Sequence, residues 1–190
     1  MTMPCQGHLD MVYHIFAFLK KHHNTEVVLD SSEPDIEEHL FQKENWEHSV
    51  YGKGHEIIPP DAPESCGLGF KISAYVDSDH AGDSITRCSR TGCLVLLNCA
   101  PIYWTSKKQG SIEASSFASE FIALKTCCEY IQGLRYKLQM MGIACDFPAF
   151  IFGDNKSVLV NSSKPFLVLK KKSVSIAYHF VREGVSNDEW

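Results

Sequence analysis

From Phe70 onward, the hydrophobic residues switch between the two-residue period of β-strands and the 3.6-residue period of α-helices. Residues 70–76 alternate and predict a strand that ends at Asp77, and 92–97 is a continuous apolar run that is typical of a central strand. Residues 101–105 predict a third strand, which a short connection joins to the second in an antiparallel hairpin.

A long helical region follows these strands. Apolar residues recur every three or four positions over 115–141, and Gly133 divides this region into two predicted helices. Residues 147–152 predict a fourth strand, and two more helices are predicted from Ser157 and over 174–185. The order β-β-β-α-α-β-α-α predicts an α/β fold, with a mixed sheet flanked by helices.

The first 69 residues differ in charge from the rest of the chain. They hold 4 basic and 12 acidic residues, a balance of −8, whereas 70–190 has a balance of +3. Residues 1–28 are interpreted as a unit that contains one helix over 6–23, and 29–69 as an acidic, proline-containing linker. Residues 70–190 form the α/β domain, and its mildly basic charge is compatible with binding to nucleic acid.

The cysteines and the apolar runs bear on the environment of the chain. None of the eight cysteines forms a Cys-x-x-Cys pair, and several lie in apolar runs, so we expect reduced thiols in an intracellular protein. The longest apolar stretch, around 93–97, is far shorter than the roughly 20 residues that span a bilayer. We therefore expect no membrane partner.

Three acidic residues stand where they are able to share divalent ions. Asp77 ends the first strand, Asp154 follows the fourth strand, and Glu120 lies early in the helical region. Open α/β sheets bind ligands beyond the carboxyl ends of their strands, and phosphodiester hydrolysis commonly uses two ions held by several carboxylates. Spacing alone also allows turn-forming, helix-capping or solvent-exposed roles for these side chains. Three other carboxylates are rival ligands that spacing does not exclude: Asp79, Asp83 and Glu113.

Six strings follow one another in a fixed order. They are Tyr-Val-Asp-Ser-Asp-His-Ala-Gly-Asp at 75–83, then 87–92, 101–109, 115–124, Ile-Phe-Gly-Asp-Asn-Lys-Ser at 151–157, and Tyr-His-Phe-Val-Arg-Glu at 178–183. Together these strings resemble, in order and spacing, the ribonuclease H domains of copia-type retrotransposon polyproteins. Residues 7–21 also resemble the helix that follows the polymerase palm in those polyproteins.

The resemblance implies a ribonuclease H-like fold whose last strand and last helix are missing, because the sequence stops before the family's fourth carboxylate. It implies a ribonuclease H-type, metal-dependent endonuclease that hydrolyses the RNA strand of RNA–DNA hybrids. Asp77, Glu120 and Asp154 would be both the catalytic residues and the ligands of two Mg²⁺ or Mn²⁺ ions. Ala118 replaces an earlier glutamate of the family. These departures leave an inactive retroelement remnant, or a weak hybrid-binding module, as the alternative.

The partners that the resemblance implies are an RNA–DNA hybrid and the rest of the polyprotein, including its polymerase domain. The implied location is the cytoplasm, a virus-like particle or the nucleus. Tyr103 and Trp104 are interpreted as core residues rather than as base-stacking residues, and His179 as an intramolecular hydrogen-bond partner. The candidate contacts to the hybrid are Arg87, Ser89, Lys107, Lys108, Asn155 and Lys156.

Overall fold

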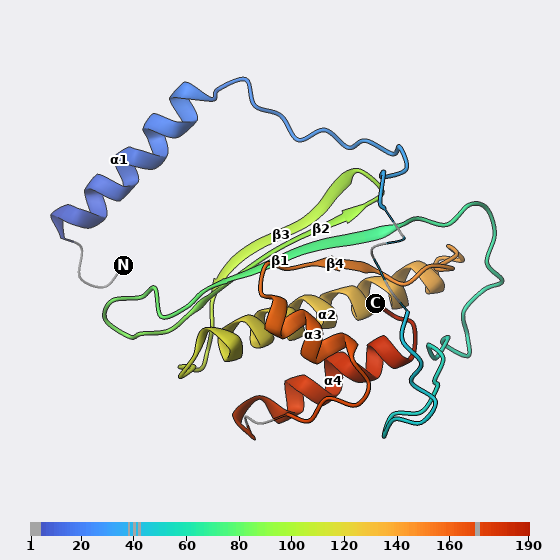
Figure 1. Ribbon diagram of the computed structural model, residues 1–190. Helices are drawn as coiled ribbons and strands as arrows, with labels where there is room; N and C mark the ends of the chain where they lie inside the picture. The colour runs from blue at the N-terminus through green and yellow to red at the C-terminus, as the bar shows by residue number, and fades with distance from the viewer. Residues whose placement is uncertain (1–4, 38, 40, 42, 170–171) are drawn as a thin grey trace.

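The computed structural model describes residues 5–37, 39, 41, 43–169 and 172–190. The strands are β1 (Ile72–Asp79), β2 (Arg90–Leu97), β3 (Ala100–Lys108) and β4 (Phe150–Phe152). The helices are α1 (Gln6–Lys21), α2 (Ser116–Met140), α3 (Lys156–Ser163), η2 (Lys172–Val174) and α4 (Ser175–Ser186). They form the predicted mixed α/β architecture, a four-stranded sheet flanked by helices (Figure 1), which is compatible with a ribonuclease H-like fold.

The sheet has the strand order β3-β2-β1-β4. The β2–β3 pair is antiparallel, as the predicted hairpin requires. The β1–β2 pair is also antiparallel, and the β1–β4 pair is parallel. Ile72, Ala74 and Val76 of β1 belong to the buried core on the helical side, whereas Tyr75 and Asp77 are exposed. Because β1 and β4 run parallel, their carboxyl ends lie at the same edge of the sheet.

Helix α2 runs without a break through Gly133, so the prediction of two helices over 115–141 is wrong. Its buried side chains, among them Phe121 and Ile131, pack in the main core. Burying one such side chain contributes roughly 1.5–3 kcal/mol, which outweighs the roughly 0.5–1 kcal/mol that an internal glycine costs a helix. The helix ends before Gly142, whose φ of +70° is the left-handed conformation typical of a helix C-terminus.

Replacing Gly133 with alanine is expected to stabilise the protein by roughly 0.5–1 kcal/mol. A Cβ atom added to Gly133 meets no atom within 4 Å, so the change only restricts the unfolded chain. Urea denaturation of the two proteins measures the difference. Gly184→Ala in α4 is the matched control and should be destabilising, because its Cβ would overlap the Trp190 ring. A Gly133→Ala protein less stable than the parent would contradict this account.

Much of the acidic segment 29–69 packs against the α/β domain. Trp46 is only 5% exposed, and its ring lies 4.8 Å from the guanidinium carbon of Arg182. Glu56 accepts hydrogen bonds from Nε and Nη2 of Arg135, at 2.8 and 2.5 Å. The segment thus adds buried contacts to the helical layer, although its described part holds no strand.

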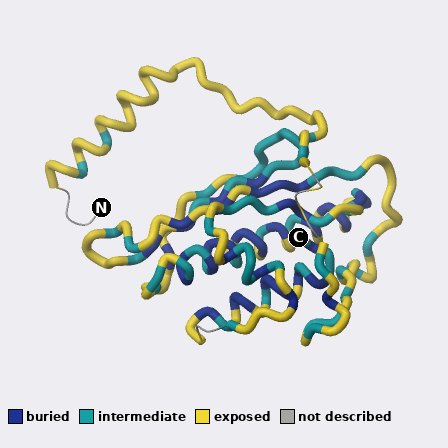
Figure 2. The backbone as a smooth tube through the Cα atoms, viewed as in Figure 1, coloured by how far each residue is buried: buried dark blue, intermediate teal, exposed yellow. Residues whose placement is uncertain are grey.

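Several side-chain predictions have a definite outcome. All the cysteines are free thiols, as predicted. The Tyr51 hydroxyl and His179 Nδ1 form a 2.6 Å hydrogen bond, which confirms the intramolecular role of His179. Tyr103 packs on Tyr130 with ring centroids 3.7 Å apart, but Trp104 is 61% exposed, so its assignment to the core is wrong. Trp104 pairs with Leu94 of β2 on the sheet face that α2, α3 and α4 leave uncovered. Figure 2 shows that the buried backbone lies mainly in the sheet and in these helices, whereas α1 is exposed along most of its length.

Within the part of the chain that the structure describes, no helix combines the length and the apolar character that crossing a membrane requires.

Candidate metal centre

Asp77, Glu120 and Asp154 meet at the carboxyl edge of the sheet. One carboxylate oxygen from each residue lies within 4.8 Å of the other two. Asp77 is near the end of β1, Asp154 is two residues beyond β4, and Glu120 is in the first turns of α2. The parallel β1–β4 pair therefore brings the two aspartates together, and α2, which packs against β1, supplies the glutamate. The three residues singled out in the sequence form one cluster.

Local structure leaves both aspartate side chains available. Asp77 Oδ1 accepts a 2.7 Å hydrogen bond from the backbone N–H of Ser78, and the side chain is exposed. The helix-capping role that the sequence allowed for Asp154 belongs instead to Asn155. Its Oδ1 accepts from the backbone N–H groups of Ser157 and Val158, at 3.1 and 3.2 Å. The Asp154 carboxylate is thus free of the cap and exposed to solvent.

The cluster concentrates negative charge around Glu120. Partial burial, followed by the negative charges of Asp154 and Asp77, raises the pKa of Glu120 from 4.5 to about 7. A divalent cation would relieve this repulsion, and carboxylate oxygens are the ligands that hard cations such as Mg²⁺ prefer. The donor set and its electrostatics therefore fit a divalent metal site.

Rising pH is expected to destabilise the metal-free protein between about pH 4.5 and 7. Because folding raises the pKa of Glu120, the folded state holds more protons than the unfolded state in this window. The stability contributed by protonated Glu120 is complete below the window and is lost as the pH rises through it. Glu120 is partly solvated, so solvent screening limits the loss to about 1 kcal/mol.

Denaturation at acidic and mildly alkaline pH, with and without Mg²⁺, measures this effect. Glu120→Gln cannot titrate and should show a smaller loss of stability on going to alkaline pH. Mg²⁺ should stabilise the parent protein more at alkaline than at acidic pH, because protons compete with the metal for the carboxylates. An identical pH dependence in the parent and in Glu120→Gln would contradict the assignment.

The rival carboxylates lie outside the cluster. Asp83 Oδ2 accepts a 3.0 Å hydrogen bond from Lys108 Nζ, and Asp83 Oδ1 accepts from the backbone N–H of Thr86 at 2.8 Å. The Thr86 backbone donor, followed by Lys108, holds the pKa of Asp83 well below its usual range. Glu113 accepts a 2.8 Å hydrogen bond from the Ser111 hydroxyl. These contacts give both side chains a local structural role.

The candidate nucleic-acid contacts differ in their environment. Arg87, Lys107 and Lys156 are exposed near the same edge of the sheet as the acidic cluster. Lys108 is also exposed, but it is paired with Asp83, and Asn155 caps α3. Ser89 is fully buried, where its hydroxyl accepts from the backbone N–H of Ala81 at 3.1 Å. The burial of Ser89 indicates a structural role for its side chain.

Sequence reasoning missed Gln109, which holds β3 against the start of α2. Its buried Nε2 donates to the Ser119 carbonyl at 2.9 Å and to the Thr91 hydroxyl at 3.0 Å. Ser119 precedes Glu120 in α2, so these bonds help to position Glu120 beside the sheet. The only signal in the sequence was the place of Gln109 at the end of the 101–109 string.

Comparisons with known proteins place these features in context. No protein-family model matches the chain. Over 121 residues, 64% of its length, the chain is 31% identical to the retrovirus-related Pol polyproteins from transposons RE2 and RE1 of Arabidopsis thaliana. Its homologues thus include Pol polyproteins of transposons. A third Pol polyprotein, from transposon TNT 1-94 of Nicotiana tabacum, is 28% identical over 117 residues, 62% of this chain.

The aligned regions are a small part of those Pol polyproteins. The chain spans 8% of the length of the RE2 and RE1 polyproteins and 9% of the TNT 1-94 polyprotein. The homology therefore associates the chain with a region of a larger polyprotein.

Proposed function

We propose that this chain is a metal-dependent endonuclease that hydrolyses the RNA strand of RNA–DNA hybrids as part of a retrotransposon polyprotein. The observation that carries the proposal is the approach of Asp77, Glu120 and Asp154 to within 4.8 Å of one another. The likeness to Pol polyproteins supports it, because the aligned relatives are retrovirus-related polyproteins that belong to transposons. The mixed α/β fold, which is compatible with that of ribonuclease H, supports it further.

The proposed roles follow from the position of each carboxylate. Asp77 and Asp154 are exposed, so a phosphodiester is able to approach them, while the less exposed Glu120 closes the cluster from the helical side. A pair of Mg²⁺ or Mn²⁺ ions held there would activate the attacking water and stabilise the leaving 3′ oxygen. Asp77 would help to hold both ions, and Glu120 and Asp154 would each help to hold one.

Basic side chains near the cluster fit the backbone of a nucleic acid. Arg87, Lys107 and Lys156 are exposed at the same edge and are proposed to contact phosphates. Binding through such contacts weakens as salt rises, because each neutralised phosphate releases counterions.

The test is to incubate the purified chain with labelled RNA–DNA hybrid, double-stranded RNA and double-stranded DNA, with Mg²⁺, with Mn²⁺ and with a chelator. We expect cleavage of the RNA strand of the hybrid alone, and only when a metal is present. Equal cleavage of all three duplexes would remove the specificity for hybrids. Binding of the hybrid without cleavage under every metal condition would overturn the enzymatic assignment and favour a hybrid-binding module.

A further inference from the structure

One row of apolar side chains crosses all four strands on the sheet face that α2, α3 and α4 leave open. The register sets Trp104 of β3 opposite Leu94 of β2, Leu94 opposite Tyr75 of β1, and Tyr75 opposite Phe152 of β4. Opposed residues project from the same face of a sheet. The Tyr75 and Phe152 rings stack 4.9 Å apart, and Tyr75 is 51% exposed. The row, named here the apolar row, is thus a continuous surface in contact with solvent.

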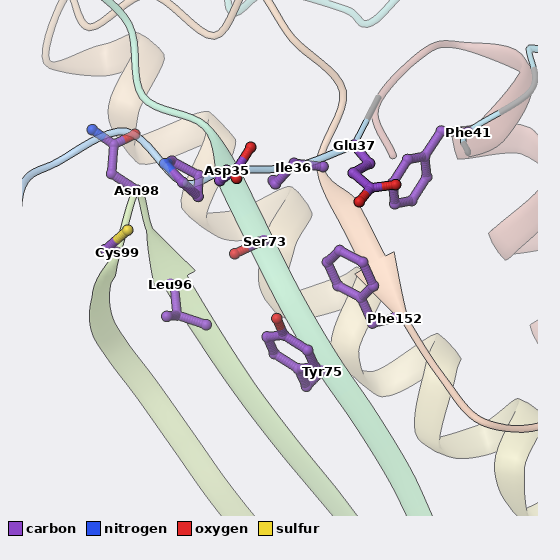
Figure 3. Close-up of a pocket in the computed structure, with 11 residues that line it drawn as sticks. Asp35, Ile36, Glu37, Phe41, Ser73, Tyr75, Leu96, Asn98, Cys99 and Phe152 are labelled. Atoms are coloured by element: carbon purple, nitrogen blue, oxygen red, sulfur yellow. The ribbon is translucent and has the colours of Figure 1, made fainter. Parts of the chain in front are cut away.

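The chain that precedes β1 already lies on part of this face. Pro34, Ile36 and Phe41 line a cavity of about 370 Å³ together with Tyr75 and Phe152 of the apolar row (Figure 3). The ring of Phe41 meets that of Phe152 edge-on, with 5.5 Å between centroids. An interface between the N-terminal part of the chain and the open face is therefore established, and it covers one end of the apolar row.

Upstream of that interface, two hydrogen bonds attach the chain to the β2–β3 hairpin. The Asn98 side chain donates to the Ser31 carbonyl at 3.0 Å, and the Cys99 backbone N–H donates to the Ser32 carbonyl at 3.2 Å. Residues 22–30 then connect this point to α1. A connection of this length spans up to about 30 Å, which exceeds the roughly 26 Å length of the eight-residue strand β1.

Helix α1 carries another apolar surface, which has no partner among the described residues. None of its residues is buried, and it contacts no other helix or strand of the described chain. Leu9, Val12, Phe16 and Leu19 form a stripe along it at helical spacing. An isolated helix of 16 residues is marginal in water, because most helical stability in proteins comes from packing an apolar face. Figure 1 shows α1 on the side of the sheet opposite to α2, α3 and α4.

We propose that α1 docks on the open face of the sheet and packs its stripe against the apolar row. The helix is about 24 Å long, close to the length of the strands that it would cover. Docking requires changes in backbone angles only within residues 22–30, where the described residues form no helix or strand beyond the end of α1. A short tether gives α1 an effective local concentration in the millimolar range, which favours it over the same helix of a second molecule.

The proposal is tested by hydrogen–deuterium exchange of the full chain, which reports the protection of the α1 amides. Trp104→Lys places a charge in the apolar row, and Phe16→Lys places one in the stripe without touching the sheet domain. We expect either change to speed the exchange of the α1 amides by at least about tenfold. Ile176→Lys, at an 83% exposed position of α4, is the matched control and should leave α1 unchanged.

The possible results distinguish α1 of the same molecule from a second copy of the chain as the partner of the open face. Protection of α1 that both variants lose, and that is independent of protein concentration, supports docking within one molecule. Protection that rises with protein concentration would overturn the proposal in favour of a second copy. Exchange of α1 at the rate of a free peptide in the parent protein would overturn docking altogether. Because Phe16 is far from the sheet core, misfolding of the Trp104→Lys domain cannot account for a loss of protection in both variants.

Discussion

Replacing Asp77 with asparagine is expected to lower the rate of metal-dependent hybrid cleavage by at least about 1000-fold. The amide keeps the shape of the side chain and its place on β1, but it removes the anionic oxygen that would help to hold both ions. A thousandfold loss corresponds to about 4 kcal/mol of transition-state stabilisation, in line with the several kcal/mol attributed to a metal ion that stabilises developing charge. Single-turnover rates with saturating protein measure this loss apart from hybrid binding.

The matched control is Asp79→Asn. Asp79 belongs to the same strand, two residues further along, and is exposed, but it lies outside the carboxylate cluster. We expect its rate to stay within about threefold of the parent rate, because a surface charge outside the cluster mainly affects the approach of substrate. Asp77→Asn with nearly unchanged cleavage, or an equal loss in both variants, would contradict the assignment. Thermal unfolding of each variant shows whether a loss of rate reflects misfolding.

The position of the carboxylate cluster was predictable because it depends on local patterns. The apolar alternation before Asp77 and the short apolar segment before Asp154 each predict a strand that ends near an aspartate. Because parallel neighbouring strands have their carboxyl ends at one edge of the sheet, the two aspartates then lie close together. Glu120 was harder to place from spacing, because a helix presents side chains in every direction. Its position depends on how α2 packs on β1, which in turn depends on the buried face of the whole helix.

The features that the sequence did not predict depend on contacts between distant residues. Gly133 suggested a helix break, but burial along both halves of α2 holds the helix together. Trp104 has a large aromatic side chain of the kind that is usually found in a core. It is exposed because, among the described residues, no helix covers its face of the sheet. The contact between Trp46 and Arg182 joins positions that are more than a hundred residues apart, so no local sequence pattern predicts it.

Arg182→Ala is expected to destabilise the protein by roughly 3–5 kcal/mol. Arg182 is 1% exposed, and its guanidinium donates to the backbone carbonyls of Asn161, Lys164 and Pro165 at 2.6–2.7 Å. Its guanidinium carbon also lies 4.8 Å from the ring centroid of Trp46. Truncation removes the donor from three backbone carbonyl oxygens, opens a cavity and removes the cation–π contact, and each of these changes is unfavourable.

Arg182→Lys tests how much of the loss is due to the shape of the guanidinium group, and Arg90→Ala is the control at an exposed position. A lysine keeps the charge, but its compact ammonium group lacks the planar fork that reaches several carbonyls at once, so we expect about half the loss of Arg182→Ala. Arg90 is exposed at the start of β2, and its replacement should change stability by no more than about 0.5 kcal/mol. Urea denaturation monitored by tryptophan fluorescence measures all three variants. A loss of less than about 1 kcal/mol in Arg182→Ala would contradict the stabilising role assigned to the buried guanidinium of Arg182.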